Sequence, residues 1–145
     1  MRYSHKLSDA VHVLAYVQIG AGRDLSSKKI AVSIDSNPSV VRRLMALLVK
    51  GGLLTTHPGT VQPKLSRPAT AISLLDIYRV VEGDSPLLHV DDKTNPQCIV
   101  GGNIQTTLNK LYNNVQTAAE AEMAAASLQD IIDDILVQAK AKRMI

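Results

Sequence analysis

The sequence is poor in the residues that several common functions require. Its 145 residues include one cysteine and four tyrosines, and they include no phenylalanine and no tryptophan. One cysteine forms no disulfide within the chain and completes no cysteine-cluster zinc site. Proteins that bind RNA or single strands by stacking need several aromatic side chains on one face, which this sequence lacks.

Long apolar runs and common catalytic motifs are also missing. The longest apolar run, residues 44–49, is far shorter than the roughly 18 residues of a membrane-spanning helix. No apolar stretch follows the first basic residues, so we expect no secretory signal, no membrane partner and a cytoplasmic location. No glycine-rich phosphate loop occurs, and no His-x-x-x-His or Cys-x-x-Cys pair occurs, so we do not expect an enzyme.

The charge is divided unevenly along the chain. Residues 1–72 hold ten lysines and arginines against three acidic residues, a net charge of +7. Residues 73–145 hold six basic and ten acidic residues, a net charge of −4. A basic half suits contact with a polyanion, and an acidic half suits self-association or solvent. Chance asymmetry is the alternative interpretation.

The first half predicts a known order of elements. Apolar residues spaced three and four apart predict three helices, and two short β-prone segments follow them. Asn37 followed by Pro38 is a strong helix start, because Asn caps the first turn and Pro fits it. The expected helices span residues 5–19, 26–34 and 38–50, and the expected strands span 53–56 and 61–65. This order is a helix-turn-helix followed by a wing.

The second half predicts a long unpaired helix. Ser73 to Asp76 resembles a capping box and opens a helix through Val81, and residues 84–98 look like a loop. A helix from about 102 to 125 then spans roughly 36 Å, more than a small domain covers, so its apolar row needs a partner. Ser127 caps a last helix. The apolar row includes Ile104, Leu108, Leu111, Tyr112 and Val115.

We therefore expect a mainly α fold with a small β-wing. Residues 1–83 form a winged helix-turn-helix head, and residues 84–145 form a loop, a long dimerisation helix and a short terminal helix. The start of the third helix would enter the major groove of duplex DNA, while the second helix and the hairpin would contact the backbone. A solvated basic face is the alternative. The expected DNA-binding residues are Lys28, Lys29, Asn37, Ser39, Val40, Arg42, Arg43, His57, Gln62 and Lys64, with Arg67 near them on the hairpin.

These segments resemble the Rrf-two (BadM-type) winged helix-turn-helix regulators of bacteria. The similarity covers nearly the whole chain and includes SHKLSDAVHVLAYV, SSKKIAVSIDSNPSVVRRLMALLVKGGLL, ISLLDIYRVVEG, NPQCIVGGNIQTTLNKLYNNVQ and SLQDIIDDIL. The resemblance implies a homodimer formed through the long helix, a palindromic DNA operator and a repressor. It also implies that the last helix packs against the partner.

The sequence departs from this family at two places. The family's wing carries an arginine that reaches the minor groove, and the stretch from His57 to Lys64 lacks it. Cluster-binding members use three cysteines before the long helix, whereas this chain has Cys98 alone and Gly101 three residues later. One thiolate per chain does not complete an iron–sulfur site, so we expect no cofactor and no metal.

Two questions stay open at the level of sequence. Cys98 is either a small buried hydrophobic residue or a thiol sensor near the start of the dimer helix. The chain is either a DNA-binding regulator or a protein-interaction module that keeps the winged-helix shape. A DNA-binding regulator would respond either through Cys98 or to a small molecule bound between the head and the dimer helix.

Overall fold

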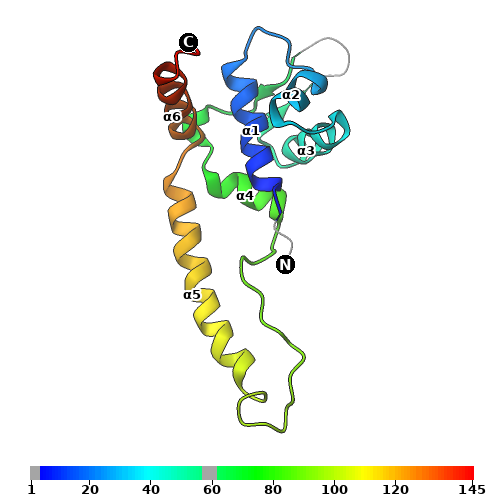
Figure 1. Ribbon diagram of the computed structural model, residues 1–145, viewed down its shortest axis with the longest axis vertical. Helices are drawn as coiled ribbons and strands as arrows, with labels where there is room; N and C mark the ends of the chain where they lie inside the picture. The colour runs from blue at the N-terminus through cyan, green and yellow to red at the C-terminus, as the bar shows by residue number, and fades with distance from the viewer. Residues whose placement is uncertain (1–3, 57–61) are drawn as a thin grey trace.

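The structure is a computed structural model that describes residues 4–56 and 62–145 (Figure 1). The predicted mainly α fold with a two-stranded wing is confirmed. We call residues 4–56 and 62–83 the head. The elements are α1 (Lys6–Ile19), α2 (Ser27–Ile34), α3 (Pro38–Lys50), β1 (Leu54–Thr55), β2 (Lys64–Leu65), the 3-10 helix η1 (Ala69–Ala71), α4 (Leu74–Glu82), α5 (Ile104–Ala125) and α6 (Leu128–Ala141).

The core of the head forms around α1. Val13 and Leu14 have no exposed surface, and α2, α3 and α4 all pack around this helix. In the described residues every buried side chain of the core is apolar. Burial of aliphatic side chains therefore holds the head together, as the aromatic-poor composition requires.

The last helix packs on the head of its own chain. Leu128 is fully buried and Ile132 is 3% exposed, and both belong to the same core as α1. Backbone hydrogen bonds from Leu128 N to Ile72 O (2.7 Å) and from Leu74 N to Ala126 O (2.8 Å) join the starts of α4 and α6. This face of α6 is therefore covered by its own chain, a contact that the resemblance did not indicate.

The helix starts follow from local side-chain chemistry. Ser26 and Asn37 accept hydrogen bonds from backbone N–H groups of the first turns of α2 and α3. Ser73 with Asp76 forms the predicted capping box, and Ser127 forms another with Asp130. Caps of this kind satisfy backbone donors that a helix leaves unpaired.

The wing is shorter than the sequence predicted. Leu54 pairs with Leu65 and Thr55 with Lys64 in an antiparallel ladder of two residues per strand. Leu53 and Leu54 are buried, so the hairpin is anchored on the core at its base. Residues 57–61, which include His57, lie outside the described residues.

A long projection extends from the head (Figure 1). It consists of residues 84–115, which are the loop after α4 and the first half of α5. The helix begins at Ile104, two residues later than predicted, and none of its 22 residues is buried. Near the head, Gln116 accepts from Leu87 N (2.9 Å) and donates to Tyr78 Oη (3.3 Å), while Arg79 pairs with Glu120 at 3.0 Å. Farther from the head, Gln105 donates to Asp91 O at 3.1 Å and so joins α5 to the loop of the same projection.

Among the described residues, no helix is both long and apolar enough to span a bilayer.

Candidate nucleic-acid interface

A tight turn sets the angle between α2 and α3. Asp35 ends α2 in the left-handed conformation with φ 59° and ψ 50°, a geometry that Asp tolerates better than most residues. Its N–H and that of Ser36 bond to carbonyls of the last turn of α2, with Ser36 N to Ala31 O at 3.0 Å. Two residues later Asn37 begins the cap of α3, which gives the compact helix-turn-helix that the sequence predicted.

Two of the predicted contact residues have structural tasks. The Asn37 side chain accepts from Val40 N at 3.1 Å and so caps α3. Val40 was predicted to face DNA from the exposed side of this helix, and that placement was wrong, because Val40 is half-buried and packs against the core. Val40 lies four residues before the buried Leu44 and therefore shares its side of the helix. Val49, which the apolar spacing of the third helix places on its inward face, is instead 38% exposed.

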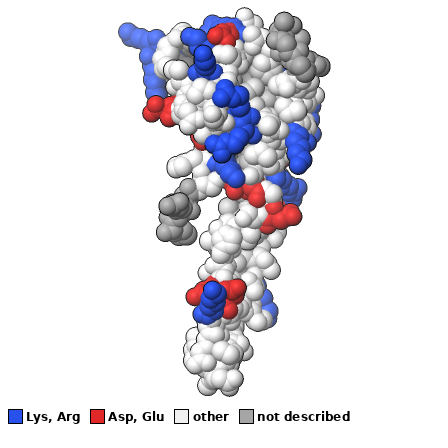
Figure 2. All heavy atoms as spheres, turned by 90° about the vertical axis from the view of Figure 1, so that its right-hand side faces the viewer, with Lys and Arg blue, Asp and Glu red and all other residues white. Residues whose placement is uncertain are grey.

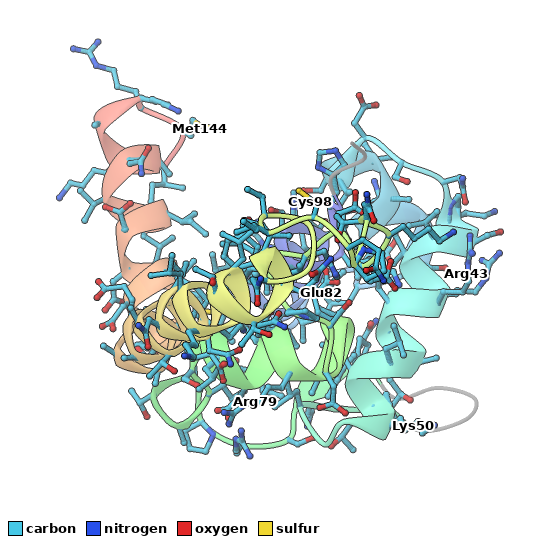
Figure 3. All side chains as sticks on the ribbon, turned by 90° about the horizontal axis from the view of Figure 1, so that it is seen from below. Arg43, Lys50, Arg79, Glu82, Cys98 and Met144 are labelled. Atoms are coloured by element: carbon cyan, nitrogen blue, oxygen red, sulfur yellow. The ribbon has the colours of Figure 1, made fainter. Side chains whose placement is uncertain are left out.

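The outer face of α3 carries the exposed polar residues. Ser39, Arg42 and Arg43 are all exposed at the N-terminal end of the helix. Arg42 lies across the start of α2, where its guanidinium donates to Ser27 Oγ and Ser39 Oγ, each at 3.4 Å. Arg43 extends from α3 (Figure 3) and lines a shallow pocket together with Lys6 and Asp9 of α1. Among the described residues, neither arginine has an acidic partner within salt-bridge distance.

Further predicted contact residues are exposed on α2 and on the wing. Lys28 and Lys29 are exposed in the first turn of α2, and Lys64 and Gln62 are exposed on the wing. Figure 2 views this side of the molecule and shows lysine and arginine side chains gathered over the head, whereas the end of the projection is uncharged. A positive surface of this kind attracts the phosphate backbone.

Arg67 differs from the other wing cations. Its guanidinium donates to Asp76 Oδ2 at 2.9 Å and forms a salt bridge with that carboxylate. Asp76 also closes the capping box of α4, and its hydrogen bond with the Ser73 backbone is the largest cause that lowers the pKa of its carboxyl. Arg67 therefore joins the wing to α4 instead of extending freely from it.

Cys98 lies near the end of the projection (Figure 3). It is exposed, so the interpretation as a buried hydrophobic residue was wrong. Hydrogen bonds with the backbone of Gly101, and then of Val100, lower the pKa of its thiol. The neighbouring Ile99 and Val100 are 88% and 66% exposed, so the thiol sits beside an unpartnered apolar tip.

The residues around Cys98 do not fit an iron–sulfur cluster. Such clusters are held by several thiolates, in some proteins joined by histidine. In the described part of the chain, no three His, Cys, Asp or Glu side chains lie close enough together to hold a metal ion.

Three helices, a tight turn and a small wing define the winged helix-turn-helix class, whose recognition helix reads duplex DNA. Over residues 3–134 the chain matches the Rrf2 family, described as iron-dependent transcriptional regulator. The chain belongs to this family, so it is a DNA-binding transcriptional regulator of the helix-turn-helix type and not an enzyme.

Individual relatives agree with this assignment. YwnA of Bacillus subtilis, named as an HTH-type transcriptional regulator, is 37% identical over 130 residues, which are 90% of this chain and 96% of YwnA. A crystal structure of a protein described as DNA-binding matches with a TM-score of 0.71 at 36% identity and covers 88% of this chain and 98% of that chain. CymR, the global cysteine regulator of B. subtilis, matches with a TM-score of 0.67 at 19% identity over 92% and 97%. This last similarity concerns the fold alone.

One positioning contact could not be found from the sequence. Ser27 holds Arg42 over the start of α2, although the two residues are 15 positions apart. Nothing in the residue spacing indicates this contact, because it depends on the angle between two helices.

Proposed function

We propose that the chain is a homodimeric repressor that binds a palindromic duplex DNA site with two winged heads. The observation that carries the proposal is the pair Arg42 and Arg43, exposed on the N-terminal end of α3 without acidic partners in the described residues. Residues 1–83 serve as the DNA-binding unit, and residues 84–145 serve as the dimerisation unit. The apolar row of α5 supports the dimeric part of the proposal.

The expected DNA contacts follow from this helix end. A helix N-terminus carries partial positive charge, which favours its approach to DNA phosphates. Arginine reads guanine through two parallel hydrogen bonds in the major groove. Arg43 is free to make such a contact, while Arg42 must first release its 3.4 Å bonds to the two serines. Lys28, Lys29 and Lys64 would neutralise phosphates on either side.

The dimer follows from the unpartnered face of α5. Leu111 and Val115 are 55% and 47% exposed although they are large and apolar. They lie four residues apart and therefore share one face, to which Ile104, Leu108 and Tyr112 also belong. A second copy of α5 would cover this face through the same residues, as two-fold symmetry requires. A two-fold dimer places its heads on two half-sites of a palindrome.

Selection from a random duplex library tests the proposal. We expect purified wild-type protein, under reducing conditions, to enrich one two-fold symmetric site, and Arg43→Ala to weaken that enrichment. Lys110→Ala, which removes an exposed cation from α5, is the matched control. Absence of enrichment from a folded dimer at low salt would favour the alternative, a protein-interaction module on the same scaffold.

A second proposal is that Cys98 adjusts DNA binding in response to oxidants. Its exposure and the lowered pKa of its thiol favour the reactive thiolate. Hydrogen peroxide would oxidise this thiolate to a sulfenic acid, and the peroxide O–O bond would break with release of hydroxide. We expect peroxide to change the DNA affinity of the wild type and not that of Cys98→Ser. Equal responses of the two proteins would contradict the proposal.

A further inference from the structure

Arg42 is held between two helices by neutral hydroxyl groups. Its guanidinium donates to Ser39 Oγ on its own helix α3 and to Ser27 Oγ on α2, each at 3.4 Å. The bond to Ser39 lies within one turn of α3, whereas the bond to Ser27 crosses to the other helix. The Ser27 bond is therefore the one that turns Arg42 over the start of α2.

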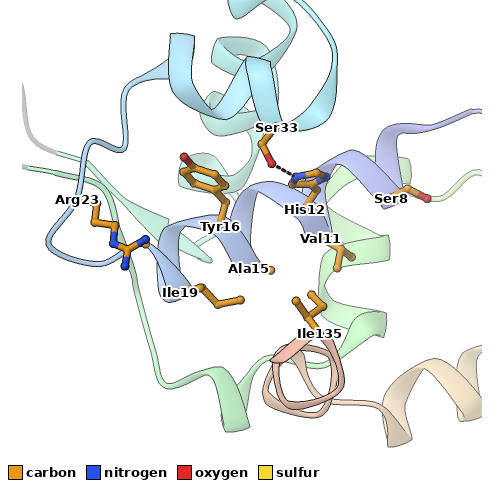
Figure 4. A pocket seen from close by; sticks show the side chains of 10 residues that line it. Ser8, Val11, His12, Ala15, Tyr16, Ile19, Arg23, Ser33 and Ile135 are labelled. Atoms are coloured by element: carbon orange, nitrogen blue, oxygen red, sulfur yellow. Dashed lines mark hydrogen bonds between the residues drawn. The ribbon is translucent and has the colours of Figure 1, made fainter. Parts of the chain in front are cut away.

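The helix that carries Ser27 is itself fixed on the head. Ile30 has no exposed surface and Ala31 is 2% exposed, so one side of α2 is anchored in the core. His12 Nε2 and Ser33 Oγ share a hydrogen bond of 2.7 Å, which links α1 to α2 (Figure 4). Ser27 therefore lies at a defined place relative to α3, from which it can orient a flexible side chain.

The hydroxyl groups orient Arg42 without neutralising its charge. Arg67 shows the contrast, because its guanidinium pairs with the carboxylate of Asp76 at 2.9 Å. Among the described residues no salt bridge involves Arg42, and Asp24, just before α2, accepts from Ser26 N at 2.9 Å. A guanidinium carries more N–H donors than two hydroxyls accept. Arg42 therefore keeps both its charge and free donors for an anion.

Exposed lysines lie at the same end of α2. Lys28 follows Ser27 in the chain, and Lys28 and Lys29 are both exposed in the first turn of the helix. Positive side chains gathered at one place repel each other, and an anion between them relieves that repulsion. We expect DNA phosphates at this helix start, so the guanidinium of Arg42 is held on the phosphate side of the interface.

We propose that Ser27 is a positioning residue that directs Arg42 to a phosphate of the DNA backbone, so that Arg43 alone of the two arginines reads a base. This role of Ser27 rests on the DNA-binding function proposed above and refines its contacts. A free arginine side chain loses rotamer freedom when it binds, and an arginine that is already held in place loses less. Phosphate contacts carry no sequence information, so Arg42 contributes affinity and Arg43 contributes selectivity.

Neutralising single phosphates locates the contact of Arg42. The duplex is the palindromic site selected by the wild type, in which phosphates are replaced one at a time by uncharged methylphosphonates. We expect one position in each half-site at which the replacement weakens the wild type and leaves Arg42→Ala unaffected. Arg42→Ala should also weaken binding to an unrelated duplex by the same factor, and make the salt slope shallower by about one per head.

A double-mutant cycle tests the role of Ser27. Ser27→Ala should weaken DNA binding about two- to tenfold, since one hydrogen bond has that order of net strength. The same change made in Arg42→Ala should have no effect, because the side chain that Ser27 positions is then absent. Ser27→Thr, which keeps the hydroxyl, should retain most of the affinity.

Two controls separate this role from a structural one. Alanine suits the first turn of a helix, so Ser27→Ala should have the stability of the wild type in urea denaturation. Ser85→Ala, which removes an exposed hydroxyl from the loop after α4, should bind DNA as the wild type does.

Three results would overturn the assignment. The first is an equal effect of Ser27→Ala in the wild type and in Arg42→Ala. The second is a loss of selectivity at one base pair in Arg42→Ala with an unchanged salt slope, because Arg42 would then read a base. The third is a pattern of methylphosphonate effects that is the same for the wild type and Arg42→Ala. A wild-type protein that binds no duplex at low salt would contradict the DNA-binding function itself, and the role of Ser27 with it.

Discussion

At the start of α3, neighbouring side chains have different tasks. Asn37 caps the helix, Val40 packs on the core, and Arg43 extends freely to solvent. Because the capping and packing residues fix the backbone, the exposed residues are presented in a defined direction. Substitutions only a few residues apart should therefore affect different properties.

Arg43→Ala should weaken binding to the selected DNA site by about 1–3 kcal/mol and relax selectivity at one base pair. Asn37→Ala should instead lower the free energy of unfolding by about 1 kcal/mol through loss of the cap. Fluorescence anisotropy measures the first effect, and urea denaturation measures the second. If Arg43→Ala destabilised the fold and left DNA affinity intact, this division of tasks would be wrong.

Asp76 should make the stability of the head depend on pH. The Ser73 backbone and Arg67 lower the pKa of its carboxyl in the folded state. A carboxyl whose folded pKa is lowered stabilises the fold at pH values above its unfolded pKa, and this contribution is lost as pH falls through the folded pKa. Asp76→Asn should therefore lower the free energy of unfolding by about 1 kcal/mol at neutral pH and by less near pH 2. Urea denaturation at the two pH values measures this difference. Asp92→Asn, which changes an exposed aspartate of the loop, should follow the wild type at both values.

At the level of elements, α5 buries little of its surface within its own chain. None of its 22 residues is buried, although its second half lies against α4, where Gln116 and Glu120 form polar bonds with Tyr78 and Arg79. An amphipathic helix of this kind is stable when its apolar face is covered. The net negative charge of residues 73–145 does not prevent a second copy of α5 from covering this face, because the apolar row itself is uncharged.

Leu111→Asp combined with Val115→Asp should dissociate the dimer. Each substitution places a carboxylate in the apolar row, and two-fold symmetry brings four new charges into one interface. Sedimentation equilibrium should show a monomer with the circular dichroism of a folded head. Asn113→Asp, which adds charge to the opposite side of α5, should leave the association state unchanged. A wild-type chain that is already monomeric would contradict the account of α5.

Periodicity and capping residues predicted where the helices begin. They did not predict how the helices are arranged in space. The Asn37–Pro38 start and both serine-led starts at Ser73 and Ser127 are confirmed, because caps depend on residues within one turn. The return of α6 to the head, the exposure of Cys98 and the bond between Ser27 and Arg42 could not be predicted. Each of these depends on contacts between segments far apart in the sequence, such as the backbone bonds that join Leu128 to Ile72 and Leu74 to Ala126.

At the scale of the whole molecule, the basic surface and the uncharged surface lie in different parts of the protein. Cations gather over the head, and an uncharged tip ends the projection (Figure 2). The basic face suits a long polyanion, and the apolar parts suit contact between copies of the chain. The positive balance of the first half therefore lies on the head, which carries the proposed DNA contacts.

The salt dependence of DNA binding should report the phosphate contacts. Log affinity should fall linearly with log salt, with a slope of about −0.9 per neutralised phosphate. Lys28→Gln combined with Lys29→Gln should make the slope shallower by up to about two without changing the preferred sequence. Lys110→Gln should leave the slope unchanged. An unchanged slope in the double variant would place the phosphate contacts elsewhere on the head.

The most direct test is a titration of the selected palindromic duplex and of the same duplex with one half-site scrambled. The account predicts two protomers per palindrome, a loss of affinity of about a hundredfold or more on scrambling, and the loss of about 1–3 kcal/mol already stated when Arg43→Ala binds the intact site. One protomer per duplex, or equal affinity for both duplexes, would contradict the dimeric DNA reader.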